Sequence, residues 1–97
     1  MANYVVLINW TERGVSEAKD TVKRSENVRQ LAQQMGGDMS TIYWTLGRYD
    51  AIAVLEAPDD ETASAIALRA AGNGAVRTET LRAFTADEMS GILGKIG

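Results

Sequence analysis

The chain has 97 residues, a net charge of −3 and a hydrophobic fraction of 45%, which is the composition of one small globular domain spanning residues 1–97. The acidic balance argues against nucleic acid or an anionic membrane as a partner, and the absence of cysteine and histidine removes thiol nucleophiles, disulfides, Cys/His zinc sites and histidine-ligated haem. No stretch approaches 18 apolar residues and no secretory signal opens the chain, so we expect a cytoplasmic protein with neither metal nor cofactor.

The first predicted elements are a strand and a helix. Residues 4–10 are rich in β-branched and aromatic side chains, which is typical of a strand. A helix follows, with a buried stripe at the i, i+3, i+4 and i+7 spacing and an end at Gly36 and Gly37. The stripe consists of Val28, Leu31, Ala32 and Met35. Asp20 or Thr21 is the expected N-cap.

The segment before this stripe is both irregular and highly charged. Val15, Ala18 and Val22 could extend the stripe backwards, with a break or kink at the helix start. Basic residues gather in the same segment, namely Arg13, Lys19, Lys23, Arg24 and Arg29. Four acidic residues lie among them, so we interpret the cluster as a solvated helix face rather than as a binding patch.

Two further strands, residues 40–46 and 49–57, flank Gly47, which can open a two-residue type II′ turn. This turn would pair Leu46 with Tyr49 and therefore Trp44 with Ala51. A large side chain opposite a small one suits a packed face, so we expect Trp44 in the core against the helices.

A helix, a strand and a short helix complete the chain. Pro58 ends the third strand, and Asp59 or Asp60 caps the next helix, which ends at Gly72. Its buried stripe is Ala63, Ile66, Ala67 and Ala70. Residues 75–84 form the fourth strand, and residues 86–93 form an amphipathic tail.

This order predicts an α+β fold, a ferredoxin-like βαββαβ sandwich with a four-stranded antiparallel sheet and both helices on one face. The first and third strands are apolar on both sides, and such strands need cover on both faces. We therefore expect a homodimer or a higher oligomer, packed sheet against sheet on the face that carries Ile52 and Val54.

The stretch Gly47-x-Tyr49-Asp50, followed by EAPDD and TETLRAF, resembles the GYD-domain family almost from end to end. The resemblance implies a bacterial protein of the dimeric α+β barrel superfamily, in a family without an established activity. Relatives in the wider superfamily include haem enzymes, cofactor-free oxygenases, isomerases and ligand-sensing domains. The resemblance thus supports the predicted fold and leaves the function open.

The first candidate site lies at the hairpin. Asp50 should lie on the face away from the helices and join Tyr43 and Thr45 at the edge of a pocket, where desolvation could make it a base. The alternative is a hairpin corner, in which Asp50 accepts hydrogen bonds from Thr45 or from turn amides.

The second candidate site lies on the fourth strand. Arg77 and Glu79 share one face of this strand, with Arg82 on the other face. They either form an ion pair at an edge strand or a dimer interface, or they hold an anionic ligand.

Three functions remain open, and we favour the binding of a small molecule in a pocket at the sheet or dimer face. One alternative is a cofactor-free oxygenase or isomerase that uses Asp50 and Tyr43. The other is a structural or assembly protein that acts through its exposed sheet.

Overall fold

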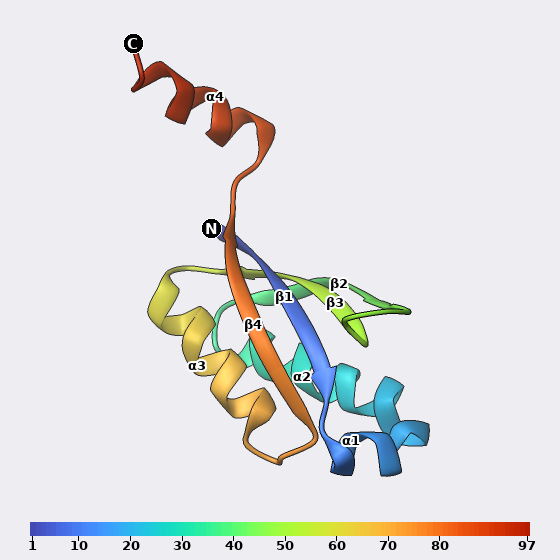
Figure 1. Cartoon of the computed structure of the whole chain (residues 1–97). Coiled ribbons are helices and arrows are strands. Elements are labelled where there is room, and N and C mark those ends of the chain that lie inside the picture. The colour runs from blue at the N-terminus through green and yellow to red at the C-terminus, as the bar shows by residue number, and fades with distance from the viewer.

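The computed structural model describes residues 1–97 and consists of one sheet, two long helices on one side of it and a separate C-terminal helix (Figure 1). The elements are β1 (Ala2–Trp10), α1 (Glu12–Ser16), a 3-10 turn η1 (Ala18–Asp20), α2 (Thr21–Gln34), β2 (Asp38–Trp44), β3 (Ala51–Ala57), α3 (Asp60–Ala71), β4 (Val76–Ala83) and α4 (Ala86–Gly94). None of the helices combines the length and the apolar character that a membrane crossing requires.

The sheet confirms the predicted α+β, ferredoxin-like fold. Its strand order is β2-β3-β1-β4, and every neighbouring pair is antiparallel. The two long helices, α2 and α3, lie together below the sheet in Figure 1. β2 and β4 are the edge strands, and the opposite face of the sheet has no helix packed on it.

The alternation along β3 decides which side chains enter the core. Ala51, Ala53, Leu55 and Ala57 are buried on the helix side, whereas Ile52 and Val54 are half-buried on the other face. Their partners on β1 follow the same division, because Tyr4 pairs with Leu55 and Val5 pairs with Val54. Alanine therefore occupies most of the core positions on β3, while the larger Ile52 and Val54 lie on the helix-free face.

The hairpin has the predicted register but a wider loop. Trp44 lies opposite Ala51 as expected, and a bulge interrupts the ladder between Met39 and Thr41. Gly47 adopts a φ of 99°, which favours glycine. The predicted two-residue turn is wrong, because the last backbone hydrogen bond of the hairpin joins Thr45 to Asp50, which leaves residues 46–49 as the loop, and Leu46 is fully exposed.

Trp44 lies at the rim of the core, and the prediction that it is buried against the helices is wrong. It does point to the helix side, where its indole Nε1 donates to Thr21 Oγ1 at 3.0 Å, but 40% of the residue is exposed. Trp44 belongs to the last pair of the hairpin ladder, and its contact with α2 is to Thr21, the first residue of that helix.

The helix start is broken, as expected, but its apolar stripe does not continue backwards. α1 and η1 precede α2, and Val22 is 61% exposed. Val22 lies within α2, six residues before Val28, and this spacing places it on a different side of the helix from the buried stripe. Val15, which precedes the 3-10 turn, is 59% exposed. Gly36 ends the α2 region with a φ of 87°, as predicted.

α4 projects away from the rest of the molecule (Figure 1). Thr85 and Glu88 form a capping box at its start, with Glu88 Oε1 accepting from the Thr85 amide at 2.9 Å. Met89 and Leu93, on one side of α4, and Ile96, just after its end, are exposed. The chain thus has two uncovered apolar surfaces, one on α4 and one on the sheet.

Candidate functional site

The five residues predicted as a site all lie on the helix-free face, but at opposite edges of it. Tyr43 on β2 pairs with Ile52, Ile52 pairs with Leu7, and Leu7 pairs with Glu79 on β4. With about 4.8 Å between strands, the backbones of Tyr43 and Glu79 are about 14 Å apart. Within one chain, the two halves of the predicted site are therefore not brought together.

The other three predicted residues, Thr45, Asp50 and Arg77, lie two residues further along the strands on the same face. Arg77 pairs with Asn9 on β1, while Thr45 donates its N–H to the backbone oxygen of Asp50 at 2.9 Å. The Thr45 hydroxyl donates to the Tyr49 oxygen at 2.5 Å. These contacts join the ends of β2 and β3 at the hairpin loop.

Asp50 anchors the end of β1. Its Oδ2 accepts a hydrogen bond from the Trp10 amide at 2.8 Å, and its own amide donates to the Ile8 oxygen at 2.9 Å. The hairpin-corner alternative expected Thr45 or turn amides as the partners of this carboxylate, whereas it accepts from the end of β1. The carboxylate extends the ladder between β1 and β3 by one contact.

Arg77 and Glu79 are both exposed on an edge strand, and neither has an ion-pair partner within the chain. Arg82, on the other face as expected, places its guanidinium 5.6 Å from the Tyr4 ring and 4.6 Å from the Phe84 ring. Arg77 and Glu79 are thus available for a contact outside the chain.

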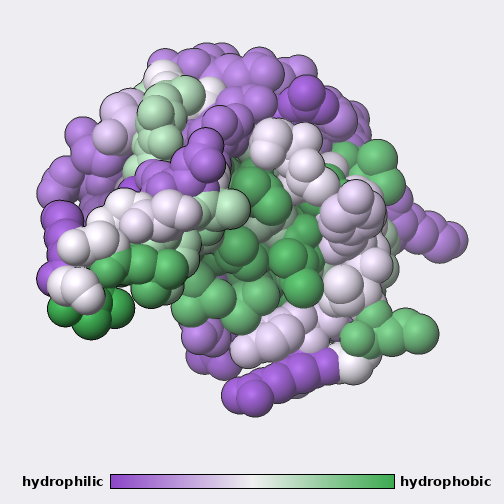
Figure 2. Space-filling view, turned by 90° about the horizontal axis from the view of Figure 1, so that it is seen from above, coloured by the Kyte–Doolittle hydropathy of each residue, from purple (hydrophilic) through white to green (hydrophobic).

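Apolar side chains fill the middle of the helix-free face between these polar edges. The view from above in Figure 2 shows hydrophobic side chains gathered at the centre and hydrophilic ones around them. By strand pairing, the central rows contain Val5, Leu7, Ile52, Val54, Leu81 and Tyr43, the last of which is 68% exposed. An exposed apolar patch with a polar rim is typical of a protein-binding surface.

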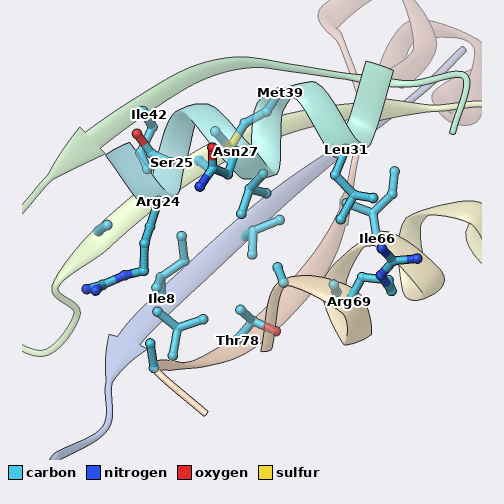
Figure 3. A pocket seen from close by; sticks show the side chains of 18 of the residues that line it. Ile8, Arg24, Ser25, Asn27, Leu31, Met39, Ile42, Ile66, Arg69 and Thr78 are labelled. Carbon is cyan, nitrogen blue, oxygen red and sulfur yellow. The ribbon is translucent and has the colours of Figure 1, made fainter. Parts of the chain in front are cut away.

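A cavity of about 410 Å³ lies on the opposite side of the sheet, beneath α2 and α3 (Figure 3). Its lining is predominantly apolar and includes Val6, Ile8, Val28, Leu31, Ala53 and Ile66. Arg24 extends from α2 at one end of the cavity and Arg69 from α3 at the other. None of the five predicted site residues lines it.

Arg24 is the functional candidate that the sequence interpretation missed. Its side chain is only 19% exposed, so it does not belong to a solvated helix face. Residues 24, 28 and 31 follow the i, i+4 and i+7 spacing, so Arg24 continues the apolar stripe of α2 by one turn. That spacing was the available signal, and the surrounding charges concealed it.

A polar contact joins β1 to the start of α3. The Tyr4 hydroxyl donates to Asp60 Oδ1 at 2.5 Å, and this hydrogen bond, with burial, raises the pKa of Tyr4 to about 12. Asp59 caps α3, as predicted, by accepting from the Thr62 amide at 2.8 Å. Hydrogen bonding from the Thr62 side chain and then from its amide lowers the pKa of Asp59. These contacts orient α3 over the sheet. Tyr4, Asp59 and Asp60 belong neither to the helix-free face nor to the lining of the cavity.

Comparison with known proteins connects the fold to one family. The model of the GYD domain matches residues 4–93. A protein of the bacterium Thermus thermophilus, named glutamine synthetase and cystathionine beta-lyase binding protein, is 33% identical over 88 residues, covering 87% of this chain and 90% of that protein. The crystal structure of TTHA0845, also from Thermus thermophilus, has a TM-score of 0.56 at 24% identity, covers 89% of this chain and 96% of that chain, and supports the fold.

Proposed function

The chain belongs to the GYD domain family, and we propose that it is a protein-binding protein that dimerises through the helix-free face of its sheet and docks as a dimer on a metabolic enzyme. The observation that carries this proposal is the apolar centre of that face, which no element of the chain covers. The named activity of the Thermus thermophilus relative, binding of two enzymes, supports the choice of partner. We also propose that the chain resides in a bacterial cytoplasm.

The dimensions of the face suit a second copy. Four strands spaced by about 4.8 Å, each about seven residues long at about 3.3 Å per residue, give a flat area of about 440 Å². A standard interface buries about 800 Å² per partner. The side chains that project from this plane add surface to the flat estimate. The exposed side of α4, with Met89 and Leu93, supplies further area for the contact.

A two-fold axis along the strands completes the proposed dimer. It places β4 of one copy over β2 of the other, so Arg77 faces the row of Thr45 and Asp50 in the second copy. Glu79 then faces Tyr43. This arrangement pairs the free charge of Arg77 with a carboxylate, and it brings together the two halves of the predicted site, which a single chain keeps apart.

Light scattering after gel filtration tests the dimer. The parent protein should have about twice the chain mass of 10.5 kDa, and Ile52→Glu should be a folded monomer because it buries a charge in the contact. Leu68→Glu is the matched control, since Leu68 is exposed on α3, away from this face. A monomeric parent, or a dimeric Ile52→Glu variant, would overturn the proposed interface.

Biolayer interferometry tests the docking. Glutamine synthetase and cystathionine beta-lyase encoded in the same genome are immobilised separately, and the parent protein is applied at up to tens of micromolar. We expect at least one of the two enzymes to bind the parent and the Leu68→Glu control equally, and to bind Ile52→Glu more weakly. Absence of binding to both enzymes would refute the enzyme-docking part, whatever the oligomeric state.

Small-molecule binding is a second candidate function, and the cavity beneath α2 and α3 favours it. The third possibility, a cofactor-free oxygenase or isomerase that uses Asp50 and Tyr43, stays a prediction. The contact of Asp50 with the Trp10 amide supports an anchoring role for that carboxylate instead.

A further inference from the structure

The C-terminal helix α4 has an apolar side that no part of the chain covers, and we propose that the two copies of the dimer exchange these helices, each α4 packing against the other copy. Met89 and Leu93 lie four residues apart on this side of α4, and both are exposed. Ile96, just after the helix, is exposed as well. This inference rests on the proposed dimer and deepens it, because it assigns to α4 a second contact that is separate from the sheet face.

A helix as short as α4 needs tertiary packing to keep its structure. It has nine residues, Ala86–Gly94, whereas isolated helices shorter than about 12–15 residues are marginal in water. Gly91, in its interior, lowers its helix propensity further. The helix has no substantial packing contact with the sheet or with the other helices, and Figure 1 shows it beyond the end of the sheet. Its apolar side therefore requires cover from another molecule.

The dimensions of the chain show how far α4 departs from a compact fold. The Cα radius of gyration is 14.5 Å and the longest dimension is 51 Å. A compact chain of 97 residues has a radius of gyration of about 12.5 Å. The excess agrees with a helix that is placed to reach a second copy.

Arg82 fixes the direction in which α4 leaves the sheet. Its Nη2 lies 3.8 Å from Glu88 Oε2, and its guanidinium lies 4.6 Å from the centroid of the Phe84 ring. Its Nη1 donates to the Asn3 oxygen at 3.2 Å, so the same side chain connects the start of α4 to β1. A helix held in this way loses less conformational freedom on binding than a flexible tail would, which favours its use as a contact element.

The proposed two-fold axis places the start of α4 beside the second copy. Ala83, the last residue of β4, shares one row of the sheet with Asn3, Glu56 and Asp38. Because the axis runs along the strands and sets β4 of one copy over β2 of the other, Ala83 faces Asp38 of the second copy. The helix begins three residues after Ala83 and therefore starts at that edge of the second copy.

The area of the exchanged helices brings the contact close to the size of a standard interface. Nine helical residues are about 14 Å long, and a helix is about 10 Å wide, so one side of α4 covers about 140 Å². Each copy buries the side of its own α4 and the surface beneath the α4 of the other copy. Together with the flat sheet area, this gives about 700 Å² per copy, compared with about 800 Å² in a standard interface.

Sedimentation equilibrium tests the exchange. Leu93→Glu should raise the dissociation constant of the dimer at least about tenfold, because it would bury a charge in the contact. Gly91→Glu is the matched control, since Gly91 lies two residues from both Met89 and Leu93, on the opposite side of α4, and a Cβ there meets no atom within 4 Å. This control should leave the dissociation constant within about threefold of the parent value.

Hydrogen exchange distinguishes a second copy from the chain itself as the cover of α4. In the parent dimer, the backbone amides of residues 89–94 should exchange at least about tenfold more slowly than in the same protein diluted below its dissociation constant. Protection of α4 that persists after dilution would overturn the exchange, because its own chain would then cover it. Equal exchange rates in the dimer and in an unprotected α4 would overturn it as well.

The remaining outcomes separate this inference from the proposed function. Equal dissociation constants for Leu93→Glu and Gly91→Glu would refute the exchange and leave the sheet contact in place, and loss of enzyme binding by such a dimeric Leu93→Glu variant would identify the enzyme as the cover of α4 instead. A dimeric Ile52→Glu variant together with a dissociated Leu93→Glu variant would refute the sheet contact alone. A monomeric parent would refute both contacts.

Discussion

Asp50→Ala should destabilise the fold because Asp50 holds the end of β1. The substitution removes the acceptor of the Trp10 amide, which Asp50 Oδ2 contacts at 2.8 Å. Both residues are half-buried, so water can partly replace the lost contact. A hydrogen bond to a charged acceptor contributes about 1.5–3 kcal/mol when it is buried, and we expect a loss near 1–2 kcal/mol here. For a domain of this size, the melting temperature should fall by roughly 5–15 °C.

Chemical denaturation followed by tryptophan fluorescence measures this effect, because Trp10 is itself part of the contact. Asp50→Asn keeps one acceptor oxygen and should lose less than about 1 kcal/mol. Glu26→Ala is the control, since Glu26 is exposed on α2 and has no ion-pair partner, and it should stay within about 0.5 kcal/mol of the parent. Equal stability of Asp50→Ala and the parent would refute the anchoring role. An Asp50→Asn variant more stable than the parent would point instead to a desolvated carboxylate.

Three further results are expected. Trp44→Ala should cost clearly less than the roughly 3–5 kcal/mol of a fully buried tryptophan, and a larger loss by urea denaturation would contradict the rim position. In an absorbance titration at 295 nm, Tyr4 should ionise near 12, and Asp60→Asn should lower this pKa. Because folding raises the pKa of Tyr4, its contribution to stability is fully present below about pH 10 and is lost as pH rises towards 12. A melting temperature that does not fall over this pH range in the parent, relative to Asp60→Asn, would argue against the contact. Gly47→Ala should cost about 1 kcal/mol through its φ of 99°, and Gly37→Ala should cost more, because its Cβ would lie 2.4 Å from a backbone oxygen; the reverse order of thermal stabilities would exclude this reasoning.

The fold was predictable because its signals are local and agree with one another. The β-branched and aromatic run of residues 4–10, the apolar run of residues 49–57, the glycines after α2 and the acidic cap of α3 each specify an element without knowledge of the rest. The pairing of Trp44 with Ala51 followed from one short hairpin. The errors appeared where an element ends, since nothing local shows whether a helix reaches far enough to cover the last residue of a strand.

The candidate site was less predictable because it depends on which side chains meet across elements. Tyr43 and Glu79 share a face, as strand alternation requires, but the strand order β2-β3-β1-β4 places them at opposite edges. The burial of Arg24 depends on the space that the alanines of β3 and α3 leave open, and the sequence of α2 alone does not show that space. A charged residue on an apolar stripe was the only local sign of it.

Side chains of different size on the two faces of the sheet account for both the cavity beneath α2 and α3 and the uncovered apolar face. On β3, alanines occupy the helix side at positions 51, 53 and 57, and Ile52 and Val54 occupy the helix-free side. A domain that was stable only through its own core would gain by the opposite arrangement, because buried apolar area stabilises at about 25 cal/mol per Å² and alanine contributes little of it. The chain instead leaves space beneath the helices and places Ile52 and Val54 on the face that no element of the chain covers. A small molecule bound in the first location and a second copy on the other would each stabilise the folded state by mass action, so the free monomer should be the least stable form of this protein.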